Sequence, residues 1–110
     1  MATNLSVLPL AVIYNGSIYR NHILRLNDNQ ISLSPFEQEC EATRFISSFL
    51  LVTSNDIIPY LKNLPLVGEG YVRVPELIEY LNSYNLFTIN DKEPTLVSVS
   101  PWGYHILNDY

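Results

Sequence analysis

The sequence predicts one α+β domain with a mostly antiparallel sheet of six or seven short strands and two short helices. Runs rich in β-branched and aromatic residues come in consecutive groups instead of alternating with helices. Two segments have a helical pattern of apolar residues. The chain has 110 residues, of which 47% are hydrophobic and 15% charged, enough to bury one core. We therefore expect residues 1–110 to form a single domain, and a rolled or barrel-like sheet is compatible with this pattern.

The segment LAVIYNGSIYRNHILRL predicts the first β-hairpin. Asn15 and Gly16 are residue types that accept positive φ at both central positions of a type I′ turn. We expect a strand over residues 10–14, a second over residues 17–26, and a turn at residues 27–29. A short third strand over residues 30–33 would complete a meander.

The segment TRFISSFLLVT, residues 43–53, predicts the central strand. Its apolar residues fall on both alternating faces, with Phe45, Phe49 and Leu51 on one of them, as in a strand that is covered on both sides. The next segment, SNDIIPYLKNLP, predicts a short helix over residues 57–63. Asp56 would be its N-cap, which places Pro59 at the third helical position, where no intrahelical donor is needed.

The segment VPELIEYLNSYN predicts the longer helix. Pro75 suits its first position, and Asn85 suits a left-handed residue at its end. An apolar stripe supports the helix, and its members are Leu77, Ile78, Leu81 and Tyr84. After it, LFTI and TLVSVS predict two strands, and WGYHIL predicts a last short strand or a tail across the sheet.

The charge and cysteine content exclude several classes of protein. The net charge is −5 and the six basic residues are scattered, so we expect neither a nucleic-acid partner nor an anionic membrane surface. No apolar run reaches the roughly 18 residues of a membrane span. One cysteine cannot form an internal disulfide, and the first residues lack a basic signal-peptide start. These features predict a cytoplasmic protein.

The segment SPFEQECEATRF contains the strongest candidate for a metal site. In an extended chain Glu37, Glu39 and Glu41 project from one face, and carboxylates suit calcium or magnesium. With His22 and His105 they form a possible metal set. However, no metal-binding spacing such as HxH or HExxH is present. We favour a solvated face that protects an edge strand, and so predict no metal and no cofactor.

Two further groups of residues bear on function. Cys40 has acidic neighbours, which disfavour a reactive thiolate, so we interpret it as a small buried apolar side chain. Eight tyrosines and one tryptophan in a weakly charged chain are typical of a protein that binds a partner. The aromatic C-terminal segment SPWGYHILNDY is the part most expected to protrude. Tyr19, Trp102 and Tyr104 are the predicted interface residues.

The segment NHILRLNDNQISLSPFEQECEATRFISSFLLVTS resembles the small β-segment that opens amidohydrolase-type proteins. The resemblance covers about a third of the chain. Where that family continues into Pro-Gly and an HxH metal motif, this chain has TSND, and 110 residues cannot hold the catalytic barrel. The resemblance therefore implies a similar β-module without the enzyme, and it carries over no catalytic residue.

The sequence contains no GxGxxG, P-loop, GxSxG or kinase motif. We therefore predict a non-enzymatic domain that acts by protein association, and above all by self-association into a homo-oligomer. One alternative is a small-ligand or metal-binding protein that uses the glutamate strand with a histidine. Another is an accessory subunit of a larger enzyme, which only the amidohydrolase resemblance suggests.

Overall fold

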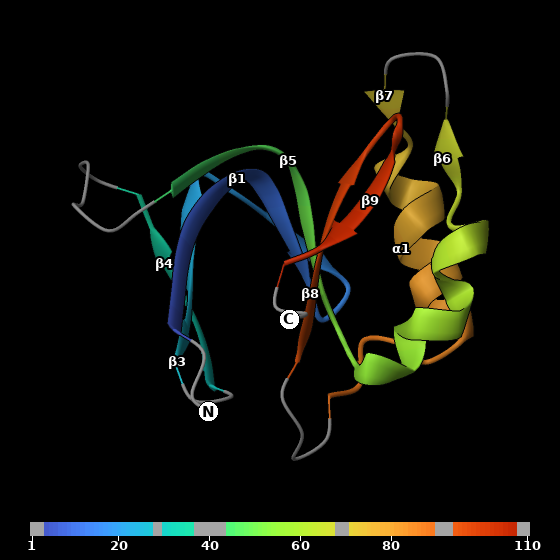
Figure 1. Cartoon of the computed structure of the whole chain (residues 1–110), viewed down its shortest axis with the longest axis horizontal. Coiled ribbons are helices and arrows are strands. Elements are labelled where there is room, and N and C mark those ends of the chain that lie inside the picture. The colour runs from blue at the N-terminus through green and yellow to red at the C-terminus, as the bar shows by residue number, and fades with distance from the viewer. Residues whose placement is uncertain (1–3, 28–29, 37–43, 68–70, 90–93, 108–110) are drawn as a thin grey trace.

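Most of the chain forms one bent sheet with a helical layer on one side (Figure 1). The computed structural model describes residues 4–27, 30–36, 44–67, 71–89 and 94–107. The seven-stranded sheet has the order β4-β3-β1-β5-β8-β9, and β2 also pairs with β1. Its strands are β1 (Asn4–Tyr14), β2 (Ser17–Arg20), β3 (His22–Asn27), β4 (Gln30–Pro35), β5 (Arg44–Thr53), β8 (Thr95–Ser100) and β9 (Gly103–Ile106).

The sheet is mostly antiparallel, as predicted, but its central pair is parallel. β1 and β5 run side by side in parallel, and their other pairings in the sheet are antiparallel. β5 is therefore a central strand between β1 and β8, in agreement with the sequence. β2 and β3 return the chain to the starting end of β1, and β4 and β5 then both run in the same direction as β1, so β5 pairs with β1 in parallel.

A register shift between Pro9 and Ala11 bends the sheet. Pro9 pairs with Ile46 and Ala11 pairs with Phe49, so β5 has one more residue than β1 across this step. Val7 and Val12 belong to the same buried cluster although they are five residues apart, whereas unbroken alternation would put them on opposite faces. Such a bulge increases local bending, and Figure 1 shows β1 and β5 arching over the space between β3 and β8.

The β1–β2 turn forms as predicted, but the second predicted strand is divided. Asn15 has φ of 52° and Gly16 has φ of 83°, the positive values that the hairpin requires. Asn21 also has a positive φ, 58°, and it separates β2 from β3. As a result β2 pairs with the end of β1, while β3 pairs with its beginning.

Two helices and a small hairpin connect β5 to β8. The first helix, η1 (Asn55–Asn63), is a 3-10 helix with Ser54 as its N-cap, not the predicted helix capped by Asp56. Pro59 lies inside it and lacks the backbone N–H that an α-helix would use there. The hairpin of β6 (Leu66–Val67) and β7 (Tyr71–Val72) follows, and α1 (Val74–Ser83) then begins with Pro75 in its first turn, as expected.

The predicted strand LFTI does not form. Asn85 has φ of 57°, so the left-handed residue that ends the helix is confirmed. The Leu86 N–H then donates to the Leu81 carbonyl oxygen at 2.9 Å, and Leu86 and Phe87 are buried. Ser54 N–H donates to the Leu86 carbonyl oxygen at 2.9 Å. These bonds hold the segment against the helices, so it is not free to extend as a strand.

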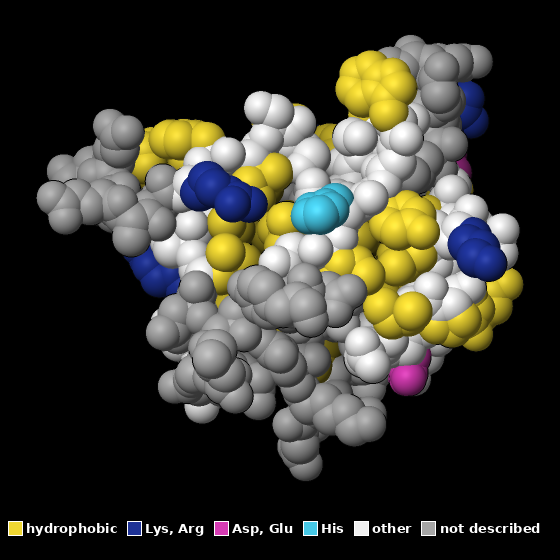
Figure 2. All heavy atoms as spheres, viewed as in Figure 1, with side chains coloured by type: hydrophobic (Ala, Val, Ile, Leu, Met, Phe, Trp, Pro, Cys, Tyr) yellow, Lys and Arg dark blue, Asp and Glu magenta, His cyan; other side chains and the backbone are white. Residues whose placement is uncertain are grey.

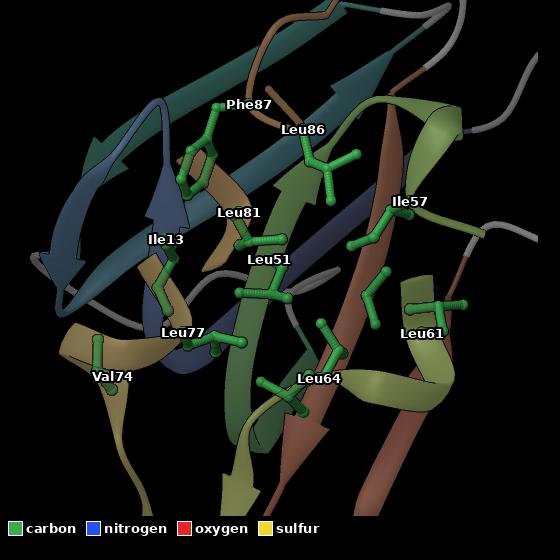
Figure 3. Close-up of a cluster of buried hydrophobic side chains, with 12 residues drawn as sticks. Ile13, Leu51, Ile57, Leu61, Leu64, Val74, Leu77, Leu81, Leu86 and Phe87 are labelled. Atoms are coloured by element: carbon green, nitrogen blue, oxygen red, sulfur yellow. The ribbon is translucent and has the colours of Figure 1, made fainter. Parts of the chain in front are cut away.

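Each face of the sheet has its own hydrophobic cluster. The outer face, as we name it, packs against η1 and α1 through the outer cluster (Figure 3). The opposite, inner face lies within the arch and holds the inner cluster. The outer cluster contains Ile13, Leu51, Ile57, Leu61, Leu64, Val74, Leu77, Leu81, Leu86, Phe87, Val97 and Val99. The inner cluster contains Val7, Val12, Leu24, Leu26, Leu50, Val52 and Leu96.

The suggestion of a barrel is wrong. In the part of the chain that is described, β4 and β9 lie at the two ends of the strand order, and each pairs with one neighbour. The bend brings the sheet only part of the way around the inner cluster. The α+β fold class itself is confirmed.

Candidate protein-association surface

The helical layer covers only part of the outer face, and the uncovered part exposes large hydrophobic side chains. β5 shows the division clearly, because it is exposed near Arg44 and Phe45 and buried from Leu50 to its end. Figure 2 shows hydrophobic side chains near the start of β5 and at the tip of the β8–β9 hairpin. The exposed fractions are 84% for Trp102, 60% for Phe45, 57% for Leu10 and 45% for Tyr104.

Two adjacent hollows lie among these side chains. The first has a volume of about 390 Å³ and the second about 330 Å³, both at the lower end of the range for ligand pockets. Both are lined by Leu10 and Ser47. The first is also lined by Leu8, Pro9, Arg20, Asn21, Phe45 and Ile46. The second is also lined by Ser48, Phe49, Val72, Val99, Ser100, Pro101 and Trp102. The hollows therefore meet where β1 and β5 are bent.

Two of the serine hydroxyl groups that line the second hollow, those of Ser48 and Ser100, form hydrogen bonds within the protein. The hydroxyl oxygens of Ser48 and Ser98 lie 2.5 Å apart and join β5 to β8. The Trp102 N–H donates to the Ser100 Oγ at 3.4 Å, which helps to hold the β8–β9 turn. The Trp102 indole itself projects into solvent. The rim of the second hollow is apolar and aromatic, with Phe49, Val99, Pro101 and Trp102 among its lining residues.

The surface carries little charge. Among the described residues that line the two hollows, Arg20 is the charged one, and no carboxylate is present. Within the described chain no ion pair is found for the Arg20 guanidinium, whereas its carbonyl oxygen lies 2.8 Å from His22 Nδ1. Although the net charge of the chain is −5, the described residues that line the two hollows include one cation and no carboxylate. Such a surface suits an aromatic or apolar group more than a hydrophilic ligand.

Two of the three predicted interface residues lie together. Trp102 is in the β8–β9 turn and Tyr104 is in β9, where it pairs with Val99 on the outer face. Tyr19 pairs with Val12 and packs against the inner cluster, with its ring centroid 5.5 Å from that of His22. The structure therefore separates Tyr19 from the other two by placing it on the opposite face.

The predicted metal set is only partly described. Glu37, Glu39 and Glu41 lie outside the described residues, and so does Cys40. Strand pairing places His22 beside Pro35 and His105 beside Ser98, in strands separated by three others in the sheet order. Within the described ranges no group of three His, Cys, Asp or Glu side chains could hold a metal ion. The metal alternative stays a prediction that the described part of the chain does not support.

Sequence reasoning missed Leu10, Arg20 and Phe45 as surface residues. Periodicity alone predicts that Phe45 lies on a covered face of the central strand, because Phe45 alternates in phase with Phe49 and Leu51. In the structure the helices reach only the second half of β5. Pro9 in the middle of a strand was the available signal, since proline within a sheet is typical of bulges and edges.

Comparison of the chain with protein-family models, curated proteins and solved structures finds no match. The resemblance to an amidohydrolase β-segment therefore stays a prediction. Of the described helices, none has the length and apolar character needed to cross a membrane.

Proposed function

We propose that this domain is a non-enzymatic association module that binds a second copy of itself through the uncovered outer face. The observation that supports this most is the exposed Trp102 at the second hollow, next to a first hollow that the exposed Phe45 lines; neither hollow has a described carboxylate. Tryptophan, tyrosine and arginine are the side chains that most often dominate binding energy at interfaces. Trp102, Tyr104 and Arg20 supply all three types along this surface.

The charge distribution favours a second copy as the partner. Two chains that each carry a net charge of −5 repel one another unless the contact keeps their acidic groups apart. The surface that we propose brings together none of the described carboxylates, and each copy contributes Arg20. A strongly basic partner would instead select an acidic face, which the described residues of this surface do not form.

The exposed area indicates a weak dimer. Aromatic side chains bury roughly 150–250 Å² each, so Trp102 and Phe45 at their observed exposure would contribute on the order of 300 Å² per copy. A standard interface takes about 800 Å² from each partner, so Leu10, Tyr104 and the rim must supply the rest. We therefore expect a dissociation constant on the order of micromolar.

Sedimentation velocity over a wide range of protein concentration tests this proposal. The wild-type chain should shift from monomer to dimer as concentration rises, and Trp102→Ser should move that transition to at least tenfold higher concentration. Ile58→Ser is the matched control, because Ile58 is an exposed apolar residue on η1, away from both hollows. A wild-type chain that remains monomeric at the highest concentration would contradict the proposal.

A further inference from the structure

We infer that two copies pair about a two-fold axis near Leu10 and Ser47, with each Trp102 seated in the first hollow of the other copy. This inference rests on the proposed self-association and specifies its geometry. It assigns the hollow lined by Leu8, Phe45 and Arg20 as the binding site for a tryptophan side chain.

The order of features along the surface is the first argument. Trp102 lines the second hollow and not the first, while Phe45 and Arg20 line the first hollow and not the second. Leu10 and Ser47 line both, so they lie between the two. The surface therefore has a projecting indole at one end, a shared middle, and an unfilled hollow at the other end.

A surface with this order is complementary to itself. A two-fold rotation about an axis through the middle carries the projecting end of one copy onto the hollow end of the other. The same contact then forms twice, and the two Leu10 side chains meet at the axis. Because Leu10 is more than half exposed, it has apolar surface to bury there. The closed symmetry also limits the assembly to two copies.

The chemistry of the first hollow matches an indole. Leu8 supplies an aliphatic wall, and Phe45, its partner in the pairing of β1 with β5, supplies an aromatic one. The Phe36 ring contacts the Phe45 ring nearly edge to face, with centroids 6.3 Å apart, and so restrains the Phe45 side chain. Arg20 at the same hollow can stack on the partner's indole, since a guanidinium is attracted to the face of a tryptophan ring.

Trp102 is the chain's single tryptophan, so its fluorescence reports this contact directly. The emission should be that of an exposed indole in dilute protein and should shift to shorter wavelength as the dimer forms. The shift should follow the same concentration dependence as sedimentation. An emission spectrum that stays unchanged while the dimer forms would show that the interface lies elsewhere.

Cysteine cross-linking tests the position of the axis. In a Cys40→Ser parent that still dimerises, Leu10→Cys should give an intermolecular disulfide under mild oxidation, because the two side chains meet at the axis. Ile58→Cys in the same parent is the control and should remain uncrosslinked. Failure of Leu10→Cys to cross-link in a dimeric protein would overturn the inferred geometry.

Mixing two variants tests whether the contact is reciprocal. A homodimer of Trp102→Ala lacks both indoles. A homodimer of Phe45→Glu should have both of its first hollows blocked. Each variant alone should therefore be monomeric at protein concentrations where the wild type is dimeric. The mixture can form a heterodimer with one intact indole–hollow contact, and it should associate at least tenfold more tightly than either variant alone. Absence of this rescue would overturn the reciprocal arrangement.

These experiments separate the two proposals. A wild-type dimer with unchanged Trp102 emission, no Leu10→Cys cross-link and no rescue would overturn the two-fold geometry while leaving self-association in place. A wild-type chain that stays monomeric at every concentration would overturn both.

Discussion

The Tyr80 hydroxyl donates a hydrogen bond to the Tyr60 carbonyl oxygen at 3.3 Å and thereby joins α1 to η1. The two rings are close to perpendicular, with centroids 6.5 Å apart. Tyr84 completes the group, with its centroid 4.6 Å from that of Tyr60 and 5.1 Å from that of Tyr80. The two helices of the outer layer are therefore connected by an aromatic group as well as by the cluster beneath them.

We expect Tyr80→Phe to lower the free energy of unfolding by about 1 kcal/mol, because it removes one hydrogen bond and keeps the ring contacts. Urea denaturation monitored by circular dichroism measures this change. Tyr84→Phe is the control that retains the Tyr80 bond. Equal stability of Tyr80→Phe and wild type would mean that the bond contributes nothing in water.

The same hydroxyl predicts a dependence of stability on alkaline pH. Burial, followed by the neighbouring Tyr84 and Tyr60, raises the pKa of Tyr80 above its ordinary value of 10.0. The folded chain thus holds this proton more tightly than the unfolded chain does. The resulting stabilisation is complete below pH 10 and is lost as pH rises through the folded-state pKa. Tyr80→Phe should therefore lose less stability than wild type when urea denaturation is repeated above pH 10.

The Ser54→Ala substitution should stabilise the folded protein, although Ser54 is the N-cap of η1. Its Oγ is buried without a hydrogen-bond partner in the described structure, and its side chain makes no capping bond. Replacing a capping serine by alanine normally lowers the free energy of unfolding by about 1 kcal/mol. Here the removal of an unsatisfied hydroxyl should instead raise the free energy of unfolding, by on the order of 1 kcal/mol. A loss of stability in Ser54→Ala by chemical denaturation would show that the hydroxyl has a partner in solution.

Gly16→Ala should destabilise the β1–β2 hairpin through the backbone alone. A Cβ at this position would lie 3.9 Å from the Asn82 Nδ2, which is an ordinary contact distance. The φ of 83° is nevertheless unfavourable for alanine, so we expect a cost of about 1–2 kcal/mol. Asn15→Gly is the control, because glycine accepts the positive φ at that position. Equilibrium unfolding of both variants separates the two outcomes, and a neutral Gly16→Ala would contradict the argument.

The two clusters should contribute separately to stability. Leu77 in the outer cluster and Leu24 in the inner cluster are each fully buried. Leu77→Ala and Leu24→Ala should each cost about 2–5 kcal/mol, because each leaves a cavity. The sheet lies between them, so the double variant should lose the sum of the two within about 0.5 kcal/mol. A clear departure from additivity in denaturant titrations would show that the clusters are coupled through the sheet.

Local signals in the sequence predicted several elements correctly. Asn15 and Gly16 marked the first turn, Pro75 the start of α1, and Asn85 its end, since each depends on a backbone preference of the residue itself. Apolar runs likewise marked β5 and β8. The same local logic failed at residues 86–89, because hydrogen bonds to Ser54 and Leu81 from other parts of the chain hold that segment.

The sequence by itself determined the α+β class of this chain and a central strand over residues 43–53, which the structure shows as β5. Only the tertiary structure decided which part of the sheet the helices leave uncovered. Periodicity shows which side chains share a face but not how far a neighbouring helix extends over it. Phe45 and Leu51 have the same alternation in β5, yet the helical layer covers Leu51 and leaves Phe45 exposed beside the hollow that we assign to Trp102.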